Sequence, residues 1–386
     1  MRRKMVAAVR AGLSLRAVAR RFNKSARIVS KWVRRAEGLR LARVDWSDRA
    51  AGNPRPRRTG VQLEATILKL RRWLHRHSAL GECGAAAIHR VLCARGTTAP
   101  CVRTIARVLA RHDTVRTRRV RRPPPPPGWH LPEVAAARTE LDSCDFVEGL
   151  TFSRQRSFDM LTAISLWGHC ATAYAIRPRK HLLGARRALT VRWQRWGLPA
   201  YAQFDNDSIF QGSHGHPSHL GRLVHYCLCL GVIPVFAPPR EQGFQNHIES
   251  FNALWQAKAW HRRHHRDAAQ LRLRSEAFLS AHHAKHALRL DAAPQRSPFP
   301  ELVPHRPVAH LVILLRRADA LGSIKIGRRS FRLPSGYAHR LVRCEWRLDL
   351  ARLTVFALHR SAPAHQPQIL QRSLHLSVTP WFSAPR

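Results

Sequence analysis

The chain has 386 residues and is strongly basic, with 67 Lys and Arg against 23 Asp and Glu and a formal net charge of +44. A chain with this charge repels itself unless a polyanion is bound, so DNA or RNA is the expected partner. The longest apolar segments are too short to cross a membrane, and the eight cysteines show neither a CxxC pair nor the spacing of a zinc site.

Residues 1–43 are expected to form three short helices. Ser14 and Ser25 precede segments with apolar residues at helical spacing, and serine is a favourable N-cap residue. The polar side of the third helix carries Arg27, Ser30, Lys31, Arg34 and Arg35. This pattern is typical of a helix-turn-helix whose second helix enters the major groove of DNA. The alternative is a three-helix packing module with a solvated basic face.

A second helical region is expected over residues 61–115. Its last helix, near residues 101–111, has apolar residues on one side and Arg103, Arg107 and Arg111 on the other. This arrangement favours a second DNA-binding region, with a helical spacer as the alternative. Residues 116–138 begin with a basic run and a run of prolines, which predicts a stiff, extended linker.

The pattern changes from helical to strand-rich at about residue 139. Three β-rich segments with short connections cover residues 140–178, and a helix, a strand, a helix, a strand and a helix follow. This is the element order of an RNase H-like α/β fold, which we place at residues 139–292. Residues 310–360 contain short strands and predict a small β-barrel. Residues 361–386 are rich in Pro and His and are expected to be an irregular tail. The predicted protein is therefore multidomain, with N-terminal all-α helix-turn-helix regions, a central α/β core and a C-terminal small β-barrel.

Three short motifs contain the acids of greatest interest, in a chain that has few carboxylates. Asp142 lies in the first strand within Glu-Leu-Asp-Ser-Cys-Asp, Asp205 precedes Asn206 at the end of the fourth strand, and Glu249 lies in Ile-Glu-Ser-Phe-Asn at a helix start. These motifs resemble the integrase-type catalytic core of the DDE transposase superfamily, over residues 139–260. The flanking regions make the chain more similar to bacterial insertion-sequence transposases than to viral integrases. Asp207 stands where the family usually has glycine.

The resemblance implies that Asp142, Asp205 and Glu249 hold two divalent ions, Mg²⁺ or Mn²⁺, which suit carboxylate ligands. It also implies cleavage at the ends of a mobile element and transfer of the freed 3′-hydroxyl to target DNA. The expected partner is double-stranded DNA, both element ends and target, bound by a homo-oligomer. Lys258 and Arg262 continue the helix of Glu249 and are candidate phosphate contacts. A bacterial cytoplasmic, nucleoid-associated location is expected, since the Arg-rich N-terminus fits a DNA-binding unit better than a transit peptide.

Three alternatives remain open from sequence alone. Glu241 has the more usual spacing from Asp205, whereas Glu249 has the better helical context, so the identity of the third acid is contested. The chain could be a non-enzymatic DNA-binding regulator or an inactive transposase remnant. It could also be a metal nuclease of RNase H type that cleaves RNA–DNA hybrids.

Overall fold

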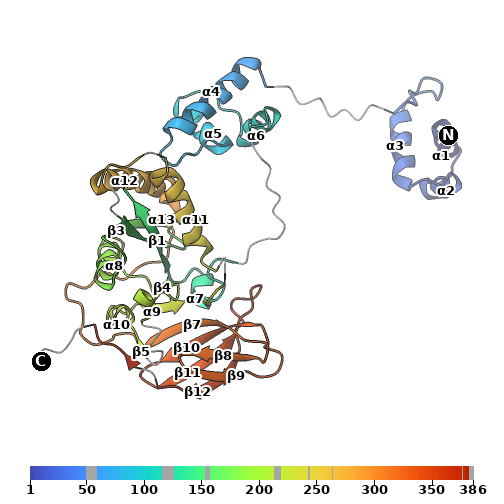
Figure 1. Ribbon diagram of the computed structural model, residues 1–386. Coiled ribbons are helices and arrows are strands. Elements are labelled where there is room, and N and C mark those ends of the chain that lie inside the picture. The colour runs from blue at the N-terminus through green and yellow to red at the C-terminus, as the bar shows by residue number, and fades with distance from the viewer. Residues whose placement is uncertain are drawn as a thin grey trace, which may run out of the picture. The chain divides into compact units, whose positions relative to one another are not determined.

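The computed structural model describes residues 1–48, 59–114, 126–152, 157–212, 219–241, 244–262, 264–375 and 377–381. The chain divides into two compact units, residues 1–64 and residues 65–386. It contains both helices and strands (Figure 1). Over the described ranges, the helices lack the combination of length and apolar character that crossing a bilayer requires.

The first unit consists of the three helices expected from the sequence, α1 (Arg2–Arg10), α2 (Leu15–Arg21) and α3 (Ala26–Ala36). The hydroxyl of Ser14 accepts a hydrogen bond from the backbone of Ala17, and that of Ser25 accepts one from Ile28, which confirms both predicted N-caps. The helices enclose a small core of Met5, Val6, Val18, Ala19, Val29, Trp32, Ala36 and Val44.

The second unit begins with helices in the region where they were expected: α4 (Val61–His77, whose first residues belong to the first unit), α5 (Ala85–Ala94) and α6 (Val102–Arg111). Helix α6 buries Ile105, Val108 and Leu109 and leaves its arginine face exposed. The amphipathic period of 3.6 residues explains this division, because every third or fourth residue faces the neighbouring helix.

The later part of the predicted linker over residues 116–138 is folded. The first part of the linker lies in residues 115–125, outside the described residues. The later part contains the short helix α7 (Pro132–Ala135). Leu131 and Val134 are buried against the sheet, and Trp129 is buried as well. These apolar side chains remove this segment from the linker and make it part of the core.

The central elements follow the predicted order, with three antiparallel strands first. They are β1 (Leu141–Thr151), β2 (Ser157–Ser165), β3 (Ala171–Ile176), α8 (Leu182–Trp196), β4 (Tyr201–Phe204), α9 (Ser208–Gln211), β5 (His219–Leu220), α10 (Arg222–Cys229), β6 (Ile233–Phe236) and α11 (Asn246–Trp255). Strands β1, β4 and β6 are parallel neighbours, and β2 and β3 extend the sheet on the other side of β1.

The C-terminal strands differ from the small β-barrel expected for residues 310–360. They are β7 (Leu311–Arg317), β8 (Ser323–Ile326), β9 (Arg329–Arg332), β10 (Leu341–Arg347), β11 (Arg352–Ala357), β12 (Gln368–Ser373) and β13 (Ser377–Val378). Strand β7 pairs with β6, and the sheet continues through β10 and β11 to β12. The open edge of β6 would otherwise present unpaired backbone groups, which explains why β7 adds to it instead of closing a separate barrel. Strand β12 also orders part of the tail expected to be irregular.

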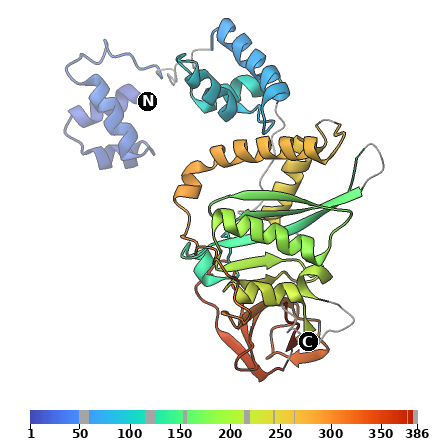
Figure 2. The same cartoon turned by 90° about the vertical axis from the view of Figure 1, so that its left-hand side faces the viewer.

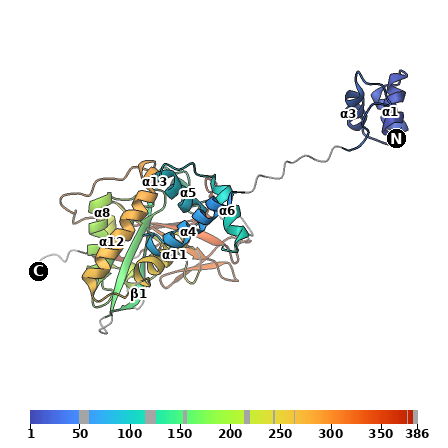
Figure 3. The same ribbon diagram turned by 90° about the horizontal axis from the view of Figure 1, so that it is seen from above.

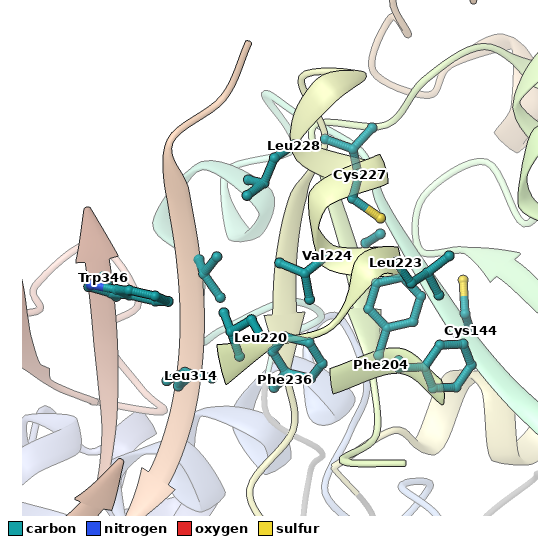
Figure 4. Packing of buried hydrophobic residues seen from close by; sticks show 14 of the residues in the cluster. Cys144, Phe204, Leu220, Leu223, Val224, Cys227, Leu228, Phe236, Leu314 and Trp346 are labelled. Carbon is teal, nitrogen blue, oxygen red and sulfur yellow. The ribbon is translucent and has the colours of Figure 1, made fainter. Parts of the chain in front are cut away.

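Helices cover both faces of the sheet (Figures 2 and 3). One face carries α11, the π-helical turn η1 (Gln256–Trp260) and α12 (Ala268–Lys285). On this face α11 contacts β1 and β2, and α12 contacts β3. Helix α13 (Ala287–Asp291) follows α12. Helices α8 and α10 lie on the other face, over a core that runs from Cys144 of β1 to Trp346 of β10 (Figure 4). This continuous core joins the C-terminal strands to the central elements.

Candidate active site

The parallel register of β1 and β4 places two acids side by side. Leu141 pairs with Tyr201 and Ser143 with Gln203, and the same offset carried two residues further sets Asp145 level with Asp205. Neighbouring strands are about 4.8 Å apart, and level residues of parallel strands share a face. Both carboxylates are half-buried. The two acids therefore lie together on the sheet face that α11 covers.

Helix α11 contributes the remaining polar groups at this place. Ile248 and Phe251 are buried against the sheet, which fixes the rotation of the helix, and Glu249 on the neighbouring side is exposed. Asn252, one turn after Glu249, is buried, and its amide donates a 2.8 Å hydrogen bond to Oδ2 of Asp145. The Asn252 amide oxygen in turn accepts a 2.6 Å hydrogen bond from the hydroxyl of Thr162 on β2.

The electrostatics show that these acids repel one another. Burial raises the pKa of Asp145 to about 6, and the negative charge of Asp205, and then of Glu249, adds to this rise. Burial also raises the pKa of Asp205. Two ionised carboxylates that lie close together repel each other, and a cation bound between them would relieve this repulsion.

A lysine lies beside the pair of acids. The ammonium group of Lys180 contacts Asp207 and Glu148, and its charge partly offsets the effect of burial on the pKa of Asp205. Over the part of the chain that the structure describes, no three His, Cys, Asp or Glu side chains are arranged closely enough to hold a metal ion. The acids are thus near one another without forming a closed ligand sphere.

Asp142 does not join this group, which corrects the first of the three predicted acids. Its carboxylate is fully buried and accepts paired hydrogen bonds from Arg192, at 2.8 and 2.7 Å, and from Arg296, at 3.1 and 2.7 Å. The indole of Trp193 donates a further hydrogen bond of 3.0 Å. Burial opposes ionisation, but the two guanidinium groups hold the pKa of Asp142 well below its usual range. Every lone-pair direction is occupied, so neither a metal ion nor DNA can reach this carboxylate.

The alternation of side chains along β1 explains why Asp142 lies apart from Asp145 and Asp205. Residues three apart on a strand point to opposite faces, so Asp142 faces α8 while Asp145 faces α11. The sequence contained both acids in one motif. The signal that could have separated them was the register with β4, which sequence alone does not give.

The two candidates for the third acid occupy different environments. Glu241 follows β6 and forms a two-point ion pair with Arg317 of β7, including a contact of 2.9 Å. This pair lowers the pKa of Glu241. Glu249 is on the helix that is bonded to Asp145, and its charge reaches that acid. The structure therefore associates Glu249, and not Glu241, with the pair of acids.

The predicted DNA-contacting residues of the helical regions are mostly accessible. On α3, Arg27, Lys31 and Arg34 are exposed, whereas Ser30 is half-buried. The guanidinium of Arg35 is already bonded to the carboxylate of Asp45 at 2.7 Å and to the backbone of Ser47. On α6, the three predicted residues Arg103, Arg107 and Arg111 are exposed.

The two predicted phosphate contacts on this side, Lys258 and Arg262, lie beside the helical region that precedes the sheet. The guanidinium of Arg262 donates to the carbonyl oxygens of His75, Arg76 and Ser78, at the C-terminal end of α4. Cations are favourable at this end of a helix. Lys258 packs against Gly81, where a side chain on the glycine would collide with the lysine. Arg262, just after η1, is thus joined to the end of α4, and Lys258 of η1 lies against the loop that follows α4.

Comparisons with known proteins find a structural likeness but no match of family or sequence. No protein-family model matches the chain, and no curated protein matches it. A solved structure that resembles it is a cryoEM structure of the simian T-cell lymphotropic virus intasome in complex with PP2A regulatory subunit B56 gamma. The match covers 72% of this chain and 91% of that chain at 14% sequence identity, with a TM-score of 0.31. This likeness is too low to assign a family.

Proposed function

We propose that the chain is a DDE-type polynucleotidyl transferase of the bacterial insertion-sequence kind, with Asp145, Asp205 and Glu249 as its acids. The observation that carries this proposal is the register that sets Asp145 beside Asp205, with α11 bonded to Asp145 through Asn252. Asp145 and Asp205 lie side by side on two strands, and Glu249 stands on the helix that packs over them. Metal-dependent in-line phosphoryl transfer uses acids brought from different elements to one place.

The strand order supports an RNase H-like core. The sheet runs β3, β2, β1, β4, β6, with the first strand in the middle and its neighbours antiparallel on one side and parallel on the other. The acids lie where β1 and β4 meet and where the helix after β6 crosses them. This order agrees with the element order that the sequence predicted.

The donor set fits a hard divalent cation such as Mg²⁺ or Mn²⁺. Carboxylate oxygens are the ligands these ions prefer. Burial first, and then the negative charge of Asp205, raise the pKa of Asp145, and a bound cation would offset both effects. Two such ions, when bound, would activate the attacking oxygen and stabilise the leaving oxygen. Asp145 and Asp205 would hold them from the sheet, and Glu249 would complete the set from α11. The hydrogen bond from Asn252 orients Asp145.

The charge of the chain supports double-stranded DNA as the substrate. A net charge of +44 makes the chain repel itself unless a polyanion is bound, and the exposed arginines of α3 and α6 provide two separate basic helix faces. We infer that α3 and α6 position the element ends and that a homo-oligomer brings two ends together.

A cleavage and joining assay tests this proposal. Purified full-length protein would be incubated with labelled duplexes that carry the terminal repeats of its own element, with Mg²⁺, Mn²⁺ or chelator. We expect metal-dependent release of a 3′-hydroxyl and joined products, both lost in Asp205→Ala. Cleavage of an RNA–DNA hybrid without any joining would instead identify an RNase H-type nuclease. Specific binding without cleavage in either metal would identify a regulator or an inactive remnant.

A further inference from the structure

A second candidate site lies in the C-terminal part of the sheet. A cavity of about 440 Å³ is lined by Trp129, Arg317, His339, Arg340, His359 and Arg360, with Leu341, Leu358 and Ser361 completing it. Trp129 is buried beneath it, and the guanidinium of Arg360 lies 5.2 Å from the centre of its ring. The lining is therefore cationic over an aromatic base.

This cavity lies on the same face of the sheet as the acids. Phe204 pairs with Phe236 and Phe236 with Leu314, so Asp205 is level with Ala237 and with Leu315. Arg317 is two residues after Leu315 on β7, so its side chain points to the same face of the sheet. Strand β10 continues this surface, because Leu341 pairs with Arg317.

The parallel strands also bring the cavity to the same edge as the acids. The carboxyl ends of β4, β6 and β7 meet at one edge, and β7 is two strand spacings from β4, roughly 10 Å. With the extra two residues of β7, the cavity begins roughly 10–15 Å from Asp205. That separation corresponds to about three or four phosphates along one DNA strand at about 3.4 Å of axis each.

The charge of the cavity is only partly balanced. Glu241 neutralises Arg317 through their ion pair, and the charge of Arg360 contributes to the lowered pKa of Glu241. Arg340 and Arg360 are exposed, and neither forms an ion pair with a carboxylate in the residues that the structure describes. Two guanidinium groups thus remain available to an anion.

We propose that this cavity binds the phosphodiester backbone of double-stranded DNA beside the acids, with Arg340 and Arg360 as the phosphate contacts. Arginine suits this task because its planar group donates two parallel hydrogen bonds to phosphate oxygens. The ion pair between Glu241 and Arg317 limits the affinity of the cavity for DNA, because it neutralises a third arginine. The choice of DNA as the partner rests on the proposed function, but the binding itself requires no reaction.

The test measures binding of a fluorescein-labelled 30-base-pair duplex to the full-length protein, by anisotropy, without divalent metal and over a series of salt concentrations. The Arg340→Ala/Arg360→Ala double variant should reduce the slope of log affinity against log salt by about 1.8, since each lost phosphate contact removes about 0.9. The matched control is Arg328→Ala/Arg329→Ala, which removes two exposed arginines next to the same sheet. Its slope should stay closer to that of the parent protein.

Two further variants make the result decisive. Glu241→Gln frees Arg317 and should raise the slope by up to about 0.9, whereas Arg340→Lys/Arg360→Lys keeps the charge and should retain most of the binding. Equal effects of the site and control pairs, or no effect of the site pair, would overturn the proposal, as would a slope that falls only with an RNA duplex. Because no cleavage is measured, failure of the proposed reaction leaves this outcome unaffected.

Discussion

The amide of Asn252 donates a 2.8 Å hydrogen bond to the carboxylate of Asp145 and so joins helix α11 to strand β1. Thr162 of β2 completes the connection by donating to the amide oxygen, which fixes the orientation of the amide group. Glu249 precedes Asn252 by three residues on the same helix, so this bond also determines where Glu249 stands. One buried asparagine therefore positions two of the three proposed acids.

We predict that Asn252→Ala reduces metal-dependent cleavage by about 100-fold, the loss expected when a reacting group moves by about 1 Å. The lost hydrogen bond lowers the pKa of Asp145 in the parent protein, so the variant should also need a higher pH to reach its maximal rate. Rate–pH profiles of the two proteins measure this. Asn246→Ala, on an exposed position of the same helix, is the control. A variant that loses rate without a shift of the profile would contradict a role in orienting Asp145.

Asp145→Asn is expected to abolish cleavage and to stabilise the fold. The folded-state pKa of about 6 lies above the ordinary aspartate value near 3.9, so the folded protein binds more protons between these values and loses stability as pH rises through that window. Removing the charge should raise the free energy of unfolding at pH 7.5 by about 1–3 kcal/mol. Urea denaturation at pH 7.5 and at pH 4 checks this, and the gain should shrink at the lower pH. A destabilised variant would show that burial of the Asp145 charge beside Asp205 does not cost stability.

Asp142→Asn should have the opposite effect on stability. Its carboxylate balances Arg192 and Arg296, and removing one partner of a buried ion pair costs about 3–5 kcal/mol. The lowered pKa of Asp142 means that its contribution is complete above about pH 4 and is lost only as pH falls towards the lower folded-state value. Denaturation of Asp142→Asn and Asp145→Asn side by side compares the two acids directly. Equal stability of the two variants would refute the separate roles assigned to them.

Local sequence predicts much of this fold because local rules determine it. Serine caps and apolar spacing place the starts of α2 and α3, and the change to β-rich segments places the order of the central elements. The barrel prediction was wrong for a non-local reason. Whether β7 closes on its own neighbours or adds to the open edge of β6 depends on pairing between strands far apart in the sequence.

The sequence located the motifs of the site but did not determine each of its residues. Helical context favoured Glu249 over Glu241. In the structure Glu241 is paired with Arg317, and Glu249 as the third acid stays a prediction. The first acid could not be chosen, because Asp142 and Asp145 share a motif and only the pairing of β1 with β4 tells which one lies beside Asp205. The contacts of Arg262 with the end of α4 could not be predicted from sequence either, since they join residues far apart in the sequence.

The exposed basic face of α3 gives a binding prediction. Arg27→Ala/Lys31→Ala/Arg34→Ala should lower affinity for the element ends and reduce the salt slope by up to about 2.7, since three phosphate or base contacts are at stake. Arg35→Ala is the comparison, because Arg35 is bonded to Asp45 and Ser47 and should affect stability of the first unit more than DNA binding. Anisotropy with end-sequence and random duplexes measures both. Unchanged discrimination between the two duplexes in the triple variant would remove the recognition role from α3.

The contest between Glu241 and Glu249 gives the sharpest test of the proposed chemistry. Glu249→Gln keeps the size of the side chain but removes a charge that reaches Asp145, so cleavage and joining should both be lost. Glu241→Gln removes only the partner of Arg317, on an exposed ion pair worth about 0–1 kcal/mol, and should leave both activities largely intact. Since Glu249 also contributes to the raised pKa of Asp145, its loss should let Asp145 ionise at a lower pH, which a titration of the folded protein followed by NMR would detect. Glu241→Gln should leave that titration in place. If Glu241→Gln were the inactive variant and Glu249→Gln the active one, the third acid would lie in the loop after β6, and the role given to α11 would be wrong.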